Sequence, residues 1–423
     1  MRNFVTIHPK EKMTGEFFVP GDKSISHRVL ILAALTKVPL EIKNLNSGED
    51  VARTRDALKF LTEPSRHPLD MGNSGTSARL LMGLLSTLPH SSTLTGDESL
   101  SRRPMKRVMD PLRQMGAKFL CPDGDHLPIT IQGGATLTSI VYRQSVPSAQ
   151  VKSAILLAGL FADGTTTVVE PIPTRDHTER LMAHLGMPIT VSHNADGEYQ
   201  ASVQGKKGFA PVSASVSVSA LEIPGDPSAA AFWIVAALLT KDSLITIKDI
   251  CWNPYRRGFC EILQKMGAAI TVIATTPRCG EDCVDLICKT SPLTAIEISA
   301  DMSASLIDEY PILAVAAAFA KGQSIFHGLG ELRHKESDRL DGIFRGLTAC
   351  GIKAEIQSDS LIIHGQSFGE SPDTPIQIFA NNDHRIAMAF SIFALAHSRP
   401  VTIHQTDTVN TSFPDFFEQV AGI

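Results

Sequence analysis

The chain has 423 residues, of which 43% are hydrophobic and 20% charged, so it has the composition of a folded protein with sizeable cores. Lys and Arg number 39 against 44 Asp and Glu, and the formal charge of −5 argues against a protein that coats nucleic acid. Its longest apolar stretches, 229–240 and 386–396, have about half of the roughly 20 residues that a membrane-spanning helix needs. We therefore expect neither a nucleic-acid partner nor a membrane partner.

The cysteines and the first residues indicate a cellular compartment. The start of the chain lacks the apolar core of a secretory signal, and the seven cysteines have no disulfide-like spacing, so we expect a cytoplasmic location. Cys279, Cys283 and Cys288 are close in sequence, but they lack CxxC spacing and a nearby His. We interpret them as ordinary thiols and expect no metal site.

One pattern occurs six times along the chain: a short polar or Gly/Pro turn precedes an apolar stretch rich in Ala and Leu. The six segments begin at Gly21, Gly72, Pro147, Gly225, Asp308 and Asn381. Each apolar stretch predicts a buried helix. Recurrence over such intervals indicates repeated folding units, and repetition alone would be compatible with a protein that has no active site.

A second pattern follows most of these helices. Segments 112–119, 181–189, 263–270 and 347–356 each predict an amphipathic helix that ends at Gly and is followed by a β-rich stretch, and a degraded version lies near residues 57–61. Alternating runs at 127–134, 243–250, 360–365 and 400–405 predict strands. The expected unit is strand–helix–strand–helix–strand–strand.

Six units of about 70 residues exceed what one core usually holds, so we expect two domains with three units each. The nearly identical segments PGDK at 20–23 and PGDP at 224–227 are candidate hinges. They predict one domain over 21–225 and a second over 1–20 and 226–423, with hinges near 20–21 and 224–226.

Basic and hydroxyl residues lie where these helices are expected to begin, and further basic residues lie in the runs 101–107 and 332–340. A helix N-terminus favours anions, and Arg can bind carboxylate or phosphate with two hydrogen bonds. Each cation taken alone is best explained as a solvated surface charge. Together, in an acidic protein, they predict a site for small ligands that carry several negative charges.

Two carboxylates accompany these cations. Asp308 precedes a predicted buried helix and could cap it, and Glu336 lies between Lys335 and Arg339 and could form a surface ion pair. If both face the basic site, they are candidates for proton transfer. His384 is interpreted as an orienting or capping residue. The chain contains no P-loop, GxGxxG, GxSxG or HExxH motif.

The motifs PGDKSISHR, GNSGT, RRPM, DEYP, HKESDR and NDHRIAM occur in this order, and together they resemble the 5-enolpyruvylshikimate-3-phosphate synthase family. The resemblance implies an α/β fold, a two-domain inside-out α/β barrel of six βαβαββ repeats, three per domain. It implies transfer of the carboxyvinyl group of phosphoenolpyruvate to the 5-hydroxyl of shikimate 3-phosphate in aromatic amino acid biosynthesis. No metal or other cofactor is implied, and we expect a monomer.

The resemblance also assigns roles to residues. Asp308 is the candidate base for the 5-hydroxyl, and Glu336 with Lys23 is the candidate for proton transfer at the methylene carbon. Residues implied to bind shikimate 3-phosphate are Lys23, Ser24, Arg28, Ser148, Ala149, Gln150, Asp308 and Lys335. Residues implied to bind phosphoenolpyruvate are Lys23, Gly75, Arg103, Gln150, Arg339 and Arg385.

The chain departs from the family pattern at several positions. Thr411 stands where many members have Lys, Ala149 replaces a frequent Ser, and His177 stands where some members have Tyr. These changes resemble a divergent bacterial branch. Gly75 resembles the residue that leaves room for the herbicide glyphosate, so inhibition by glyphosate is a hypothesis.

Three alternatives remain. UDP-N-acetylglucosamine enolpyruvyl transferase shares the fold and the donor, but it usually has a reactive Cys where this chain reads GDESLSRRP. RNA 3′-phosphate cyclase uses related folding units, but no nucleotidylated-His signature is present. A non-catalytic anion-binding protein would not need Asp308 and Glu336.

Overall fold

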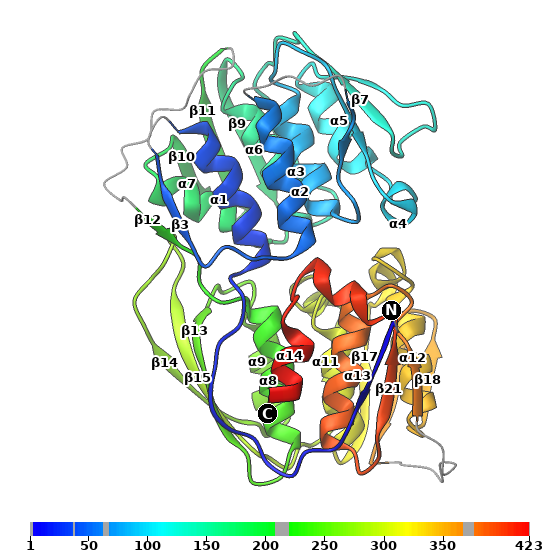
Figure 1. Ribbon diagram of the computed structural model, residues 1–423. Coiled ribbons are helices and arrows are strands. Elements are labelled where there is room, and N and C mark those ends of the chain that lie inside the picture. Colours follow the sequence, from blue (N-terminus) through cyan, green and yellow to red (C-terminus); the bar gives the residue numbers. More distant parts are fainter. Residues whose placement is uncertain (1–2, 37–38, 62–66, 208–219, 367–375, 423) are drawn as a thin grey trace. The chain divides into compact units, whose positions relative to one another are not determined.

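The computed structural model of the chain describes residues 3–36, 39–61, 67–207, 220–366 and 376–422 (Figure 1). By its internal contacts the chain divides into two units. Unit 1 consists of residues 1–20, 224–277 and 282–423, and unit 2 consists of residues 21–223 and 278–281.

The described strands of unit 2 form three sheets. One has the order β4 (Leu69–Asp70), β5 (Ser92–Thr95), β7 (Ile129–Gln132), β6 (Lys118–Leu120). Another has the order β10 (Ile189–His193), β11 (Tyr199–Gly205), β9 (Gly164–Glu170), β8 (Val141–Arg143). The third pairs β12 (Ala220–Glu222) with β3 (Glu41–Lys43).

Unit 1 also has three sheets in its described residues. The first has the order β14 (Ala269–Ala274), β15 (Cys283–Lys289), β13 (Leu244–Cys251), β2 (Thr14–Phe17). The second has the order β16 (Glu297–Ile298), β17 (Gly322–Phe326), β19 (Ser360–Gly365), β18 (Ala354–Gln357). The third has the order β1 (Phe4–Ile7), β21 (Val401–His404), β20 (Ile376–Phe379).

All four of the four-stranded sheets share one pairing pattern. An edge strand pairs in parallel with its neighbour, and the remaining two pairings are antiparallel. The antiparallel pairs β6–β7, β10–β11, β14–β15 and β18–β19 join consecutive strands, whereas each parallel pair requires a crossover. A helix lies in three of these crossovers, and the connection from β2 to β13 includes residues 21–223 of unit 2. The expected α/β class is confirmed. The described strands form separate sheets and do not close into a barrel.

The described helices of unit 2 are α1 (Lys23–Leu35), α2 (Glu49–Leu58), α3 (Gly75–Leu85), α4 (Glu98–Ser101), α5 (Lys106–Gln114), α6 (Ala149–Gly159) and α7 (His177–His184). Those of unit 1 are α8 (Pro227–Leu239), α9 (Gly258–Lys265), α10 (Ser303–Leu306), α11 (Tyr310–Phe319), α12 (Arg339–Ala349), α13 (His384–Ala396) and α14 (Phe416–Gly422). Short 3-10 helices occur at η1 (Lys59–Leu61), η2 (Ala300–Met302), η3 (Gly330–His334) and η4 (Thr406–Thr411).

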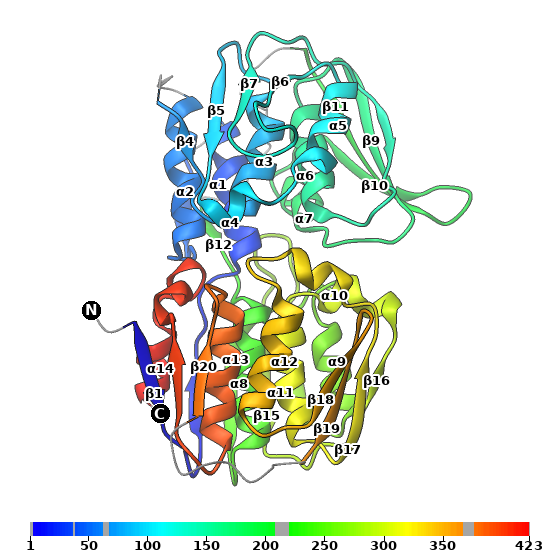
Figure 2. The same cartoon turned by 90° about the vertical axis from the view of Figure 1, so that its right-hand side faces the viewer.

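The predicted apolar helices are the cores of the two units. In unit 1, α8, α11 and α13 pack against one another and are buried along nearly their whole length (Figure 2). In unit 2, α3 and α6 pack closely, and Gly83 allows this because it has no Cβ. A Cβ at that position would lie only 2.2 Å from the carbonyl oxygen of Ala154. The amphipathic helices α5, α7, α9 and α12 end before Gly116, Gly186, Gly267 and Gly351, all with positive φ, as predicted.

One segment differs from the chain-order prediction. Residues 278–281 connect β14 and β15 of unit 1, and we expected them in the second domain, yet their contacts place them in unit 2. Arg278 pairs with Glu222, and the thiol of Cys279 contacts the Glu222 carbonyl at 3.2 Å. Such long-range pairs leave no periodic signal in the sequence.

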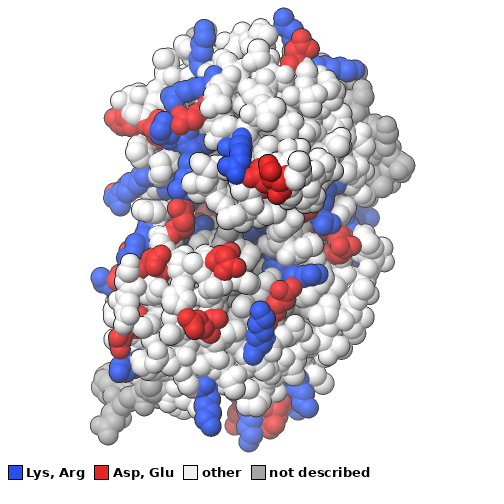
Figure 3. All heavy atoms as spheres, turned by 180° about the vertical axis from the view of Figure 1, so that it is seen from behind, with Lys and Arg blue, Asp and Glu red and all other residues white. Residues whose placement is uncertain are grey.

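On the face that Figure 3 shows, Lys and Arg side chains lie among Asp and Glu side chains on each unit. Within the described ranges, none of the helices combines the length and apolar character that crossing a bilayer would require.

Candidate functional site

Helix α1 of unit 2 begins at two of the candidate residues. The Asp22 side chain accepts a hydrogen bond from the Ile25 amide at 2.7 Å and caps the helix. Lys23 is the first helical residue, and its Nζ lies 2.9 Å from a carboxylate oxygen of Asp50 on α2. Lys23 is therefore held by a carboxylate while a small part of its side chain remains exposed.

Arg28 lies one turn after Ser24 and is buried. Its guanidinium donates to the Ser24 carbonyl at 2.9 Å, to Thr178 Oγ1 at 2.7 Å and to Ser153 Oγ at 2.9 Å. Burial lowers the pKa of Arg28 to about 10, and the carboxylate of Glu179 opposes that shift. Arg28 thus stays protonated at neutral pH, and its contacts join α1 to α6 and α7.

At the start of α3, Gly75 lies beside two guanidinium groups. Ser74 caps the helix, and a Cβ added to Gly75 would lie 2.7 Å from Arg79 Nη1 and 3.4 Å from Arg103 Nη1. Arg103 donates to Asn73 Oδ1 at 2.6 Å and to Ser99 Oγ at 3.2 Å. The missing side chain at Gly75 leaves room for these cations next to the helix start.

The start of α6 carries three further candidates, Ser148, Ala149 and Gln150. Ser148 caps the helix by accepting from the Val151 amide at 3.3 Å, and Ala149 is the first helical residue. Gln150 donates to Thr76 Oγ1 at 3.0 Å and accepts from Arg79 Nη1 at 3.1 Å. The side chain of Gln150 therefore ties the start of α6 to the start of α3.

These contacts bring the unit 2 candidates together at the starts of α1, α3 and α6, and we call this group the unit 2 cluster. Its members are Lys23, Ser24, Arg28, Gly75, Arg103, Ser148, Ala149 and Gln150. Sequence reasoning left Arg79 out of the assignment, although its position one turn after Gly75 was a usable signal.

A buried ion network lies one turn after the start of α6, next to the unit 2 cluster. Lys152 is fully buried, and its Nζ lies 2.7 Å from Glu170 and 2.8 Å from Glu179. Burial alone would lower the pKa of Lys152, but the two carboxylates raise it. Lys152 Nζ also lies 4.8 Å from the centre of the Tyr199 ring. A Lys within an apolar helix was the available sequence signal for this network.

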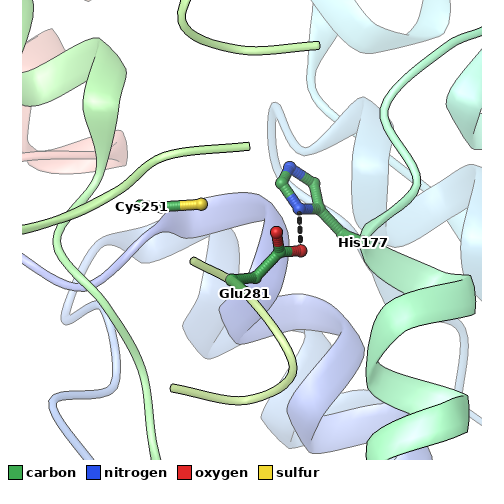
Figure 4. Close-up of side chains that lie close together, drawn as sticks. All are labelled: His177, Cys251 and Glu281. Carbon is green, nitrogen blue, oxygen red and sulfur yellow. Dashed lines mark hydrogen bonds and ion pairs between the residues drawn. The ribbon is translucent and has the colours of Figure 1, made fainter. Parts of the chain in front are cut away.

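His177, noted as a departure from the family pattern, begins α7 and is buried. Its Nδ1 lies 2.7 Å from Glu281 Oε1, as Figure 4 shows. Arg180 Nε lies 3.7 Å from the other oxygen of Glu281. Glu281 belongs to the segment 278–281, so His177 helps to hold that segment within unit 2.

In unit 1, the candidate Arg339 is fully buried among carboxylates. Its Nε lies 2.8 Å from Asp383, its Nη2 contacts Glu336, and its Nη1 lies 3.7 Å from Asp308. Burial alone would lower the pKa of Arg339, but Asp383, Glu336 and Asp308 raise it. Within the described part of the chain, Nη1 makes no hydrogen bond, which leaves a cationic donor for an anion.

Asp308 connects the remaining unit 1 candidates. Its Oδ1 lies 4.0 Å from Lys335 Nζ as well as near Arg339, and its backbone carbonyl accepts from Arg385 Nη1 at 3.0 Å. Helix α11 begins at Tyr310 after Glu309, so Asp308 is not its capping residue. We call Asp308, Lys335, Glu336, Arg339 and Arg385 the unit 1 cluster.

Asp383 lies at the start of α13, and the sequence analysis assigned no role to it. It caps α13 by accepting from the Arg385 amide at 2.9 Å, and it also binds Arg339. The capping that we considered for His384 therefore belongs to Asp383, and His384 is the first residue of the helix. Thr411, a second departure from the family pattern, lies in η4 and donates to the Thr408 carbonyl at 2.9 Å.

Comparisons with known proteins agree in their result. The family model described as EPSP synthase (3-phosphoshikimate 1-carboxyvinyltransferase) matches residues 7–420. A 3-phosphoshikimate 1-carboxyvinyltransferase from Rhodospirillum rubrum is 43% identical, and the match covers 98% of this chain and 96% of that protein. One from Paramagnetospirillum magneticum is 44% identical, with 97% and 95% covered.

A solved structure gives the same family. The EPSP synthase from Acinetobacter baumannii has a TM-score of 0.82 and 39% identity to this chain, and the match covers 99% of this chain and 97% of that one.

Proposed function

Because the chain belongs to the EPSP synthase (3-phosphoshikimate 1-carboxyvinyltransferase) family, we propose that the unit 2 cluster and the unit 1 cluster bind its two substrates and carry out its reaction. The chain is an enzyme of aromatic amino acid biosynthesis. It transfers the enolpyruvyl group of phosphoenolpyruvate to the 5-hydroxyl of shikimate 3-phosphate and releases phosphate.

The charge of the substrates fits the cations of the two clusters. Each substrate carries one carboxylate and one phosphate, and a phosphate bears about −1.5 to −2 charges at neutral pH. The observation that carries the proposal is the buried Arg339, whose Nη1 is a donor without a hydrogen-bond partner among the described residues. A buried guanidinium of this kind favours a carboxylate or a phosphate.

For shikimate 3-phosphate we assign the starts of α1 and α6. Lys23, Ser24 and Arg28 supply cations and a hydroxyl on α1, and the start of α6 supplies donors from Ser148, the Ala149 backbone and Gln150. The anion-binding property of a helix N-terminus supports this assignment. Lys335 and Asp308 of the unit 1 cluster complete the set for this substrate.

For phosphoenolpyruvate we assign the residues around Gly75 and Arg339. Lys23, Gly75, Arg103 and Gln150 belong to the unit 2 cluster, and Arg339 and Arg385 belong to the unit 1 cluster. The absent Cβ at Gly75 supports close approach of a ligand to the backbone. By the same reasoning, glyphosate would compete for this space.

The reaction proceeds in two steps. In the first, the 5-hydroxyl oxygen forms a bond to C2 of phosphoenolpyruvate, the hydroxyl proton passes to Asp308, and the methylene carbon receives a proton from Glu336 or Lys23. In the second, the bond between C2 and the phosphate oxygen breaks and phosphate leaves, while the group that protonated the methylene carbon, Glu336 or Lys23, takes a proton back from the new methyl group. The double bond is thereby restored, and the proton held by Asp308 passes to the departing phosphate.

Arg339 is the residue best suited to stabilise the charge that develops in these steps. Its guanidinium is fixed by Asp383 and Glu336 before substrate arrives, so little reorganisation is needed during the reaction. Metal or other cofactor chemistry has no assigned part in this proposal.

The finer architecture is also a proposal. Units 1 and 2 correspond to the two expected domains, each with three βαβαββ repeats of an inside-out α/β barrel, and the shared pairing pattern of the four-stranded sheets supports it. We further propose that the protein acts as a monomer in the cytoplasm.

The function is tested by measuring phosphate release from phosphoenolpyruvate with each acceptor separately. Release with shikimate 3-phosphate, and none with UDP-N-acetylglucosamine, is the expected result. Phosphate release only with the nucleotide sugar would assign the chain to the related transferase. Absence of phosphate release with both acceptors would favour a non-catalytic anion-binding protein.

A further inference from the structure

Three helices of unit 2 meet at a buried chain of hydrogen bonds that the reaction described above does not use. It consists of His27 on α1, Thr54 on α2, Ser77 on α3 and Ser74, which caps α3, and all four residues are fully buried. Thr54 Oγ1 lies 2.7 Å from His27 Nδ1 and 2.7 Å from Ser77 Oγ. Ser77 Oγ in turn lies 2.7 Å from Ser74 Oγ and 3.1 Å from the Asp50 carbonyl.

The ends of this chain are next to candidate substrate-binding residues. Ser74 caps α3 directly before Gly75, and Asp50 holds Lys23 at 2.9 Å through its side chain. His27 follows Lys23 by one turn on α1. Thr54 therefore connects the helix that carries Lys23 to the helix that begins at Gly75.

Counting protons fixes the direction of the hydrogen bonds. Burial lowers the pKa of His27 well below its usual value, with Lys23 and Arg28 acting in the same direction, so the ring is neutral and has one N–H. The one hydroxyl proton of Ser77 is directed at the Asp50 carbonyl or at Ser74 Oγ, so Thr54 donates to Ser77 and accepts from His27 Nδ1. The other ring nitrogen, Nε2, has no hydrogen-bond partner among the described residues. Placing the proton on Nδ1 avoids a buried N–H without an acceptor.

We propose that Thr54 is a positioning residue for the binding of phosphoenolpyruvate. Its hydroxyl accepts a hydrogen bond from His27 and donates one to Ser77, and it thereby sets the distance between Lys23 and Gly75. This inference rests on the proposed function, because Lys23 and Gly75 are assigned there to the same substrate. Lys23 is assigned to both substrates, but Gly75 is assigned to phosphoenolpyruvate alone, and shikimate 3-phosphate has a further anchor in Arg28, which Ser153 and Thr178 fix. The effect of losing the Thr54 hydroxyl is therefore expected to be unequal between the substrates.

The test compares Thr54→Val, which removes the hydroxyl at nearly constant volume, with Thr54→Ser, which keeps it. Thr166→Val is the matched control, because Thr166 is equally buried in unit 2 and its Oγ1 makes no hydrogen bond within the described residues. Initial rates give kcat and both KM values, and thermal unfolding records any loss of stability.

For Thr54→Val, we expect the KM for phosphoenolpyruvate to rise by about fivefold, because a hydrogen bond between neutral groups contributes about that factor. The KM for shikimate 3-phosphate should change by less than about twofold, since Arg28 and the start of α6 still hold this substrate. Thr54→Ser should restore the wild-type value, and Thr166→Val should leave both constants unchanged. Equal changes in both KM values, unchanged kinetics, or failure of Thr54→Ser to restore them would overturn the role of Thr54.

A second measurement does not depend on turnover. ¹⁵N NMR of the His27 ring, with its signals identified by their loss in His27→Gln, should show the proton on Nδ1 in the wild type and a changed spectrum in Thr54→Val. A proton on Nε2 in the wild type would contradict the bond directions. Absence of turnover in the wild type would reject the proposed function together with this role, whereas turnover unaffected by Thr54→Val would reject the role alone.

Discussion

Replacing Lys152 with Met removes the only cation that contacts both Glu170 and Glu179 in the ion pairs described for unit 2. The side chain is fully buried, with its Nζ 2.7 Å and 2.8 Å from the two carboxylates. Met has a similar length and packs in the same space, so the main change is electrostatic. The two carboxylates would then be buried without the ammonium group that now lies against both.

The expected loss of stability is large. Removing one partner of a buried ion pair costs about 3–5 kcal/mol, out of a total stability of about 5–15 kcal/mol for a typical domain. Burial already raises the pKa of Glu179, and Lys152 opposes that rise, so the variant should have a still higher pKa at this residue. A carboxylate whose pKa is raised in the folded state is less destabilising when protonated. The loss should therefore be largest at pH 8 and smaller at pH 5.

Urea unfolding at both pH values provides the measurement, with Lys118→Met as the control because Lys118 is exposed on β6 of the same unit. Far-UV circular dichroism follows both units, whereas Trp fluorescence follows unit 1, which contains both tryptophans, Trp233 and Trp252. Equal unfolding midpoints for Lys152→Met and Lys118→Met at pH 8 would refute the electrostatic reasoning. A loss that is the same at pH 5 and pH 8 would also refute it.

Three further predictions concern the reaction and the thiols. Asp308→Asn should lower kcat by about 10²–10⁴-fold, as expected for loss of a general base, while calorimetry still detects shikimate 3-phosphate binding; near-normal turnover would remove Asp308 from that role. Gly75→Ala should raise the KM for phosphoenolpyruvate and weaken inhibition by glyphosate, because its Cβ would lie 2.7 Å from Arg79 Nη1; unchanged inhibition would contradict the assignment of this space. Of the seven cysteines, Cys121 alone is not buried, so a thiol reagent should label one site rapidly in the native protein, and rapid labelling of several would contradict the packing.

The elements of the fold that could be predicted are those whose cause is local. The continuous apolar stretch at 227–239 predicts a buried helix, and the structure has α8 there. The Gly at position 351 predicts a helix end, and the structure has it at positive φ just after α12. The Asp22 cap of α1 is equally local. Residues 278–281 could not be placed, because pairs such as Arg278 with Glu222 join positions far apart in sequence.

The candidate site was predicted through motifs rather than geometry. The family resemblance supplied Asp308 and Arg339, and the structure adds that Asp383 holds Arg339 while capping α13. That double role has no sequence signature, since an Asp before a helix indicates only a cap. Lys152 was overlooked for a related reason: its partners Glu170 and Glu179 come from β9 and α7, and only the folded chain brings them together.

The central claim is that the chain transfers the enolpyruvyl group by breaking the bond between carbon and the bridging oxygen. It is tested most directly with phosphoenolpyruvate labelled with ¹⁸O at that oxygen, shikimate 3-phosphate as the acceptor, and mass spectrometry of both products. We predict that the label leaves entirely with phosphate, and that the acceptor gains the mass of the enolpyruvyl group. Label retained in pyruvate, with the acceptor unchanged, would show a phosphatase-type cleavage and contradict the transfer reaction.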